Sequence, residues 1–274
     1  MTDTATAEFI KELGRISNAH ATTQVFADVV RAMRVALQRP VERDADYSAD
    51  LERQYMALVD KYGAANWQHA ANCMALVIQR LEERREDFLG HILEEIGANN
   101  THNGQFFTPV SVSRLMARVN CHPVLADYQR GRPITICDPA CGAGVLLIEA
   151  AEYLRQHGVR QGDLLIVAGD IDGRACDICY TQLNLLGYPA IVCHQDGISL
   201  KMYERPAYTS GWYIHGLPLR GIDGERYISR RLPPKTATAP VLPTCKPQPP
   251  PRPKDAPLIV NVNSNAPAQM EFNL

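Results

Sequence analysis

A glycine-rich turn between an apolar strand-like stretch and an apolar helical stretch constrains this 274-residue chain more than any other feature. The turn is Asp138-Pro-Ala-Cys-Gly-Ala-Gly144; residues 134–137 precede it and residues 145–153 follow it. Glycines let a backbone approach a ligand where a Cβ atom would collide, and the amides of the turn and of the following helix N-terminus face an anionic group. The pattern predicts a nucleotide-type pocket at the end of a buried strand.

From residue 101 onward, strand-like and helical patterns alternate along the chain. The expected strands are 134–137, 164–169, 190–194 and, fourth, 211–215, and the expected helices are 110–119, 143–157 and 173–186. Such alternation implies βαβ units and a parallel sheet that is buried on both faces. The fold class is therefore α/β.

The N-terminal part of the chain is expected to be helical. Between residues 4 and 97, apolar side chains recur at helical spacing, and Pro40 and the stretch 44–48 interrupt that pattern. A last helix over 85–96 ends at Gly97. We expect a helical N-terminal domain over residues 1–100 and an α/β domain over 101–231.

A proline-rich stretch over residues 232–257 follows the α/β part, and proline-rich sequence of this kind is typical of extended linkers. Residues 258–262 alternate in a way that predicts a short strand. Residues 232–274 are therefore expected to form a linker and a C-terminal tail. We expect the short strand, a second copy or a partner to cover the sheet edge near Trp212 to His215.

Acidic residues stand at the ends of the next two expected strands. Asp170 and Asp172 follow the second strand and Asp196 follows the third. A carboxylate at the second position accepts hydrogen bonds from ribose hydroxyls, and Asp170 matches that position better than Asp172. Any one of these aspartates, taken alone, is equally typical of a strand-end turn.

Together with the upstream run Gly104-Gln-Phe-Phe-Thr-Pro109, these elements resemble the adenine-N6 DNA methyltransferases, most closely the modification (M) subunits of type I restriction-modification systems. The resemblance implies a Rossmann-like S-adenosylmethionine-dependent methyltransferase fold and S-adenosyl-L-methionine as cofactor, with no metal. Asp138 would contact the cofactor's amino group, Asp170 its ribose and Asp196 its adenine amine. The other cofactor-binding residues that the resemblance implies are Gln105, Phe107, Thr108 and Pro109, which close over the methionine carboxylate, and Ala140, Gly142 and Gly144.

Two further segments extend the resemblance. In the family, a helical N-terminal domain leads through Asp-x-Leu-Gly-like residues into the Phe-Thr-Pro segment, and Asp87-Phe-Leu-Gly90 stands there in this chain. The run Gln182-Leu-Asn-Leu-Leu-Gly187 resembles the family's Asn-Leu-x-x-x-Gly helix end.

One family motif is missing. The family holds the target adenine with Asn/Asp-Pro-Pro-Tyr/Phe after the fourth strand, where the polar acceptor and the proline carbonyl bind the exocyclic amine and the aromatic ring stacks on the flipped base. This chain has His215-Gly-Leu-Pro-Leu219 there, without the acceptor or the aromatic residue. The sheet is expected to be incomplete, and the sequence assigns no catalytic residue.

Three functions remain open at this point. The chain is an adenine-N6 DNA methyltransferase whose target-base motif is degenerate or partner-supplied, a catalytically inactive accessory or regulatory module, or a helical interaction protein that engages restriction machinery. The cofactor motifs favour the first two. Expected partners are duplex DNA and restriction-modification subunits or a second copy of the chain. The stretch Gln269 to Leu274 also resembles peptides that dock on the bacterial sliding clamp.

Charge and composition agree with a DNA-associated protein of the cytoplasm. Net charge is −2, yet residues 197–254 hold 10 basic and 3 acidic side chains, which suits phosphate contacts as well as a solvated tail. The N-terminus lacks a signal-peptide pattern, and no apolar run reaches the roughly 20 residues that span a bilayer. Eight dispersed cysteines indicate reduced thiols, and Cys176 and Cys179 have the spacing of ordinary helix neighbours rather than of a zinc site.

Overall fold

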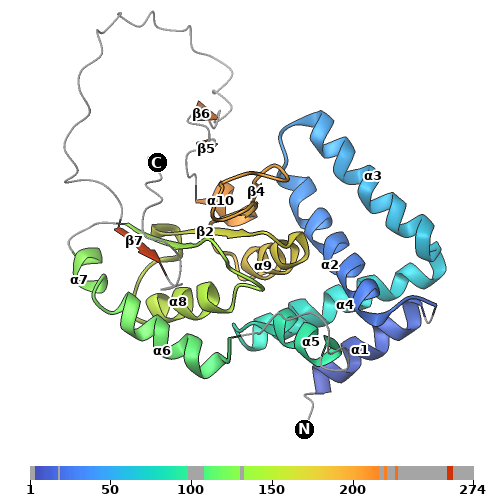
Figure 1. Cartoon of the computed structure of the whole chain (residues 1–274), viewed down its shortest axis with the longest axis horizontal. Helices are drawn as coiled ribbons and strands as arrows, with labels where there is room; N and C mark the ends of the chain where they lie inside the picture. The colour runs from blue at the N-terminus through green and yellow to red at the C-terminus, as the bar shows by residue number, and fades with distance from the viewer. Residues whose placement is uncertain are drawn as a thin grey trace, which may run out of the picture.

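The structure, a computed structural model, describes residues 4–17, 19–97, 108–129 and 133–215 and the strand residues 219–220, 226–227 and 258–261. Figure 1 shows a helical part, in blue and cyan, packed beside an α/β part that runs from green through orange to the red strand β7. Gln105 and Phe107 of the predicted cofactor site lie outside the described residues, as do the proline-rich stretch and the stretch 269–274.

The N-terminal part is helical as predicted. Its helices are α1 (Thr4–Ile16), α2 (Thr22–Gln38), α3 (Ala45–Tyr62), α4 (Ala64–Glu83) and α5 (Phe88–Gly97), with a short 3-10 turn η1 (Arg39–Val41) after α2. The prediction of a break over 44–48 is wrong, because the Asp44 side chain accepts hydrogen bonds from the amides of Asp46 and Tyr47 and thereby starts α3.

The α/β part contains the first three predicted strands and the predicted helices within a few residues of the expected bounds, together with further short elements. In chain order they are α6 (Val110–Cys121), α7 (Leu125–Tyr128), β1 (Ile134–Asp138), α8 (Val145–Gln156), η2 (Gln161–Asp163), β2 (Leu164–Asp170), α9 (Gly173–Leu185), β3 (Ala190–His194), β4 (Ala207–Tyr208), α10 (Ser210–Ile214), β5 (Leu219–Arg220), β6 (Arg226–Tyr227) and β7 (Leu258–Asn261).

The main sheet has the order β4-β3-β2-β1-β7, and β5 and β6 form a separate two-stranded ribbon. Strands β3, β2, β1 and β7 run parallel, whereas the two-residue β4 pairs antiparallel with β3. The strands are rich in β-branched residues, and β1 is buried along its whole length. A parallel sheet of this kind places the carboxyl ends of its strands along one edge, where ligands bind in α/β folds.

The expected fourth strand over 211–215 is wrong, because residues 210–214 form the short helix α10. The Asn184 side chain accepts hydrogen bonds from both the amide and the hydroxyl of Ser210 at the start of that helix. Trp212 is buried in a small apolar cluster with Ile191 and Cys193 of β3. These long-range contacts fix a helical turn where the local pattern alone favoured a strand.

The expected strand near residue 258 is confirmed, but its predicted position is wrong. Leu258 to Asn261 pair in parallel with β1, on the opposite side of the sheet from residues 212–215 (Figure 1). The register sets Leu258 opposite Ile134 and Asn261 opposite Cys137. Residues 212–215 form no strand edge, because they lie in or directly after helix α10. Strand β7 pairs instead with the edge of β1 that lies opposite β2.

The helical part and the α/β part share one continuous group of buried apolar residues. Helix α2 lies against α9, and a charged network reinforces that contact: the Arg31 guanidinium lies 3.0 Å from Asp177 and that of the buried Arg34 lies 3.3 Å from Glu204. Burying charges is costly unless they are paired, so this pairing ties α2 to α9 and to the connection after β3. The domain boundary predicted near residue 100 falls between the described ranges and stays a prediction.

Candidate functional site

The carboxyl ends of β1, β2 and β3 bring three of the predicted site residues to one edge of the sheet. Asp138 is the last residue of β1, Asp170 is the last residue of β2, and Asp196 comes two residues after β3. Asp138 is buried and its carboxylate accepts a hydrogen bond from the Ala140 amide at 3.0 Å. The tertiary structure therefore places these three carboxylates as the sequence predicts.

The glycine-rich turn needs glycine at two positions. Gly142 and Gly144 have φ angles of 54° and 97°, which residues with a Cβ atom rarely adopt. A Cβ atom on Gly144 would also lie 2.9 Å from the Cys179 sulfur of α9, whereas one on Gly142 would meet no atom within 4 Å. The turn is therefore packed tightly against α9 behind Gly144 and open at Gly142.

Asp170 holds the turn to the end of β2. One carboxylate oxygen accepts the Gly142 amide at 2.8 Å, and the other accepts the Asp172 amide at 2.9 Å. Asp172 in turn caps the start of α9 by accepting a hydrogen bond from the Arg174 amide. The structure thus separates the two aspartates: Asp170 faces the turn, and Asp172 is a helix cap.

Most amides of the turn already have partners within the protein, in contrast to the expectation that they would be offered to a ligand. The Cys141 amide donates to the Gly169 carbonyl, and the Gly144 amide donates to the Cys141 carbonyl. The amides of Ala140 and Gly142 donate to Asp138 and Asp170. The donors for an anionic group are therefore those of the first turn of α8, which have no intrahelical acceptor.

Asp196 has a local structural role. One of its carboxylate oxygens accepts the Ile198 amide at 2.9 Å, and the other accepts the Ser199 hydroxyl at 2.7 Å. The hydrogen bonds from the Ile198 amide and from Ser199 lower the pKa of this carboxyl. The carboxylate therefore stays ionised and shapes the turn after β3, and the remaining lone pairs of its oxygens are what it can offer to a ligand.

Two apolar residues at this edge escaped the sequence analysis. Ile171 follows Asp170 directly and Ile198 follows Asp196 by two positions, and their exposed fractions are 64% and 87%. Exposed isoleucines beside buried strand ends suit contact with a flat apolar ring. The sequence feature that could have identified these two isoleucines is their position close after Asp170 and Asp196.

Gln182, on α9, joins the turn to the helical part of the chain. Its amide nitrogen donates to the Asp87 carboxylate at 2.8 Å and to the Ala143 carbonyl at 3.1 Å, while its oxygen accepts the Leu89 amide at 2.9 Å. Burial raises the pKa of Asp87, which also caps α5 through the Gly90 amide. The run Asp87-Phe-Leu-Gly90 and the Gln182 side chain therefore belong to one hydrogen-bond network that holds the glycine-rich turn.

The upstream segment is described only from Thr108 onward. Thr108 is half-buried, and Pro109 is exposed at the N-terminal cap of α6. The cysteines that share the helix spacing, Cys176 and Cys179, are both buried on α9. Burial raises the pKa of the Cys176 thiol, so it stays protonated.

Comparison with known proteins identifies a family that part of the chain resembles. The family described as N-6 DNA Methylase matches residues 84–195, from the end of α4 to the residue after β3. This segment, which is less than half of the chain, is therefore similar to that family. The match includes Asp87, the glycine-rich turn, Asp170 and Gln182, and it ends one residue before Asp196.

A curated protein that this chain resembles is the methylase subunit of the type I restriction enzyme MjaIX from Methanocaldococcus jannaschii. The two are 32% identical over 110 residues, which make up 38% of this chain and 18% of the relative. The chain therefore spans less than a fifth of that relative's length.

Solved structures give weaker likenesses. A protein of Listeria monocytogenes described as a class I S-adenosylmethionine-dependent methyltransferase has a TM-score of 0.42 and 17% identity, over 75% of this chain and 57% of that chain. The methyltransferase subunit of a type I restriction-modification system from Streptococcus thermophilus has a TM-score of 0.36 and 14% identity, over 69% of this chain and 56% of that chain.

Among the described residues of this chain, no helix is both long enough and apolar enough to cross a membrane.

Proposed function

We propose that this chain binds S-adenosylmethionine at the carboxyl ends of β1, β2 and β3 and is the cofactor-binding part of an adenine-N6 DNA methyltransferase of the type I modification-subunit kind. The observation that carries the proposal is the Asp170–Gly142 hydrogen bond, which sets a ribose-type acceptor against an open glycine turn. The sequence match over residues 84–195 supports the same proposal.

The residues present fit such a cofactor. The first turn of α8 offers amide donors for its carboxylate, and Asp138 is a buried carboxylate suited to its amino group. The carboxylate of Asp170 has lone pairs left for ribose hydroxyls, and Ile171 and Ile198 present exposed apolar surface for a purine ring. The bound cofactor would supply an electrophilic methyl group.

Gly142 leaves open space where a side chain would stand, so the backbone of the turn can be approached closely. Thr108, Pro109, Ala140, Gly144 and Asp196 complete the described part of the proposed site. Gln105 and Phe107 stay predictions, because they lie outside the described residues.

Methyl transfer by this chain alone is expected to be weak. The sequence His215-Gly-Leu-Pro-Leu219 offers neither a polar acceptor for the adenine amine nor an aromatic side chain. Loss of one hydrogen-bonding group in an active site commonly costs about 10²- to 10³-fold in rate. A catalytically inactive accessory module is therefore the second candidate function, and the missing motif is the observation that favours it.

The proposed partners follow from the proposed methyltransferase function and from the missing target-base motif. Duplex DNA would carry the target adenine, and restriction-modification subunits or a second copy would supply what the sheet lacks. The sliding-clamp contact through Gln269–Leu274 stays a prediction.

Calorimetry on the full chain tests the proposal. We expect a saturable isotherm with S-adenosylmethionine that Asp170→Ala weakens. Absence of binding by the wild type at millimolar cofactor contradicts the proposal. A tritiated-methyl transfer assay on duplex DNA then separates the two candidates, because turnover by the isolated chain excludes the inactive module.

A further inference from the structure

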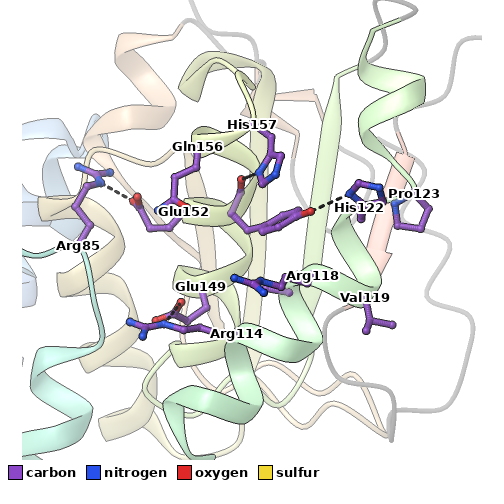
Figure 2. A pocket seen from close by; sticks show the side chains of 12 residues that line it. Arg85, Arg114, Arg118, Val119, His122, Pro123, Glu149, Glu152, Gln156 and His157 are labelled. Atoms are coloured by element: carbon purple, nitrogen blue, oxygen red, sulfur yellow. Dashed lines mark hydrogen bonds and ion pairs between the residues drawn. The ribbon is translucent and has the colours of Figure 1, made fainter.

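A hollow lies away from the proposed cofactor site, between helices α6 and α8. It has a volume of about 810 Å³, and Figure 2 shows it from close by. Arg114, Arg118 and His122 of α6 and its C-terminal end face Glu149 and Glu152 of α8 across it. We call this hollow the α6–α8 groove.

The groove has more positive than negative charge available to a ligand. Glu149 is paired with Arg114, whose Nε atom lies 3.1 Å from the carboxylate, and Glu152 is paired with Arg85 and Arg155. Arg118 forms none of the ion pairs found among the described residues. Figure 2 shows the Arg118 side chain extending from α6 into the groove, where its charge is free to meet an anion.

The neighbouring flank of α6 is apolar and exposed. Leu115 and Val119 are separated by one helical turn and have exposed fractions of 62% and 64%, and Val112 precedes them on the same flank. Small residues, Ser113, Ala117 and Cys121, form the buried face of α6. The outward surface of α6 is thus divided lengthwise into a basic strip with Arg114 and Arg118 and an apolar strip with Leu115 and Val119.

We propose that this two-strip surface docks an acidic amphipathic helix of a partner protein. A carboxylate of that helix would pair with Arg118, and its apolar side chains would cover Leu115 and Val119. Charge complementarity selects an acidic partner, and arginine beside apolar surface is typical of protein interfaces. A nucleic acid backbone would engage Arg118 but would gain nothing from covering Leu115 and Val119, so the apolar strip favours a protein.

The probe for this proposal is a phage-displayed library of 16-residue helical peptides with randomised outward positions, selected on the full chain. Peptides that also bind an Arg118→Glu variant are removed in a counter-selection. We expect the enriched peptides to carry Asp or Glu beside apolar residues at helical spacing. Their dissociation constants should rise at least about tenfold for Arg118→Glu and for Leu115→Ser.

Arg53→Glu is the matched control, because Arg53 is an exposed arginine of α3 outside the groove, and it should leave peptide binding unchanged. Equal thermal unfolding of all variants excludes a folding defect. A 20-base-pair duplex DNA serves as the second probe, and DNA binding that falls with Arg118→Glu and not with Leu115→Ser would overturn the proposal in favour of nucleic acid. Enriched basic peptides, or no enrichment, would overturn it as well.

Discussion

The Gly142 amide donates to the Asp170 carboxylate at 2.8 Å, across 28 positions of sequence. This hydrogen bond joins the turn after β1 to the end of β2, two strands that run parallel side by side. The acceptor proposed for a ribose also fixes the shape of the turn that would hold the rest of the cofactor. If the proposed function holds, cofactor binding and the local order of the turn would be coupled through this one carboxylate.

Replacing Asp170 tests that coupling. We expect Asp170→Ala to weaken S-adenosylmethionine binding by roughly 1–3 kcal/mol, because the ribose donors lose their acceptor and the Gly142 amide is released. The control is Asp163→Ala at the opposite end of β2, where the carboxylate pairs with Tyr128 and Arg160. Isothermal titration calorimetry that finds equal weakening by both variants would contradict the assignment.

A pair of glycine substitutions separates backbone strain from close packing. Gly144 and Gly158 both have positive φ angles, 97° and 86°, but only at Gly144 would a Cβ atom meet a neighbour. Gly158→Ala should lower the free energy of unfolding by about 1–2 kcal/mol, which is the cost of the left-handed conformation. Gly144→Ala should cost more, and urea unfolding measures both.

The excess cost at Gly144 has a specific source, the Cys179 sulfur at 2.9 Å. Adding Cys179→Ala to the Gly144→Ala chain should recover that excess. If the two alanine substitutions cost the same, the turn is not packed against α9 as described.

Gln182 is expected to support the turn from behind. Gln182→Leu removes the side-chain hydrogen-bond partner of the Leu89 amide and of the Ala143 carbonyl. It also removes a donor to the carboxylate of the buried Asp87. Each buried group left unsatisfied costs about 1–3 kcal/mol, so the loss of unfolding free energy should reach at least about 3 kcal/mol. Thr181→Val is the matched control on the same helix, because the Thr181 hydroxyl bonds only the Asp177 carbonyl of its own helix among the hydrogen bonds described. A loss no larger than that control's in chemical denaturation would refute the supporting role.

The buried thiols should resist labelling in the folded protein. Burial raises the pKa of Cys193 and of Cys137 to about 12, so only about 10⁻⁴ of each is ionised at pH 8. Cys245 is the cysteine outside the described residues, and Cys245→Ser removes its signal from the assay. In that chain, a disulfide reagent at pH 8 should label neither Cys193 nor Cys137 in the folded state and both in urea. Rapid labelling of the native chain would show that these thiols are accessible.

These thiols also make stability depend on pH. Their pKa is higher in the folded chain than the roughly 8.5 of an unfolded cysteine, so the folded state holds the protons more tightly. The contribution is fully present below about pH 8 and is lost as pH rises toward 12. Urea unfolding between pH 7 and 10 should therefore show falling stability, and less so for Cys193→Ala.

The amino-acid sequence by itself determined the helical N-terminal part, the three strands β1 to β3 and the acidic residues at their ends. These features depend on local chemistry: the spacing of apolar side chains sets the type of element, and the turn of Gly142 and Gly144 has the positive φ angles that glycine permits. Parallel strands then bring Asp138, Asp170 and Asp196 to one edge without further information.

Only the tertiary structure decided the rest, because it depends on partners far apart in the sequence. Residues 210–214 are helical because Asn184 binds Ser210 and Trp212 is buried against the sheet. Strand β7 pairs with β1, since a short apolar run carries no mark of its neighbour. The packing of separate elements also decided three further features: the hydrogen-bond partners of the turn amides, the contacts of Gln182 with the turn, and the groove beside Arg118. Local periodicity does not encode such packing.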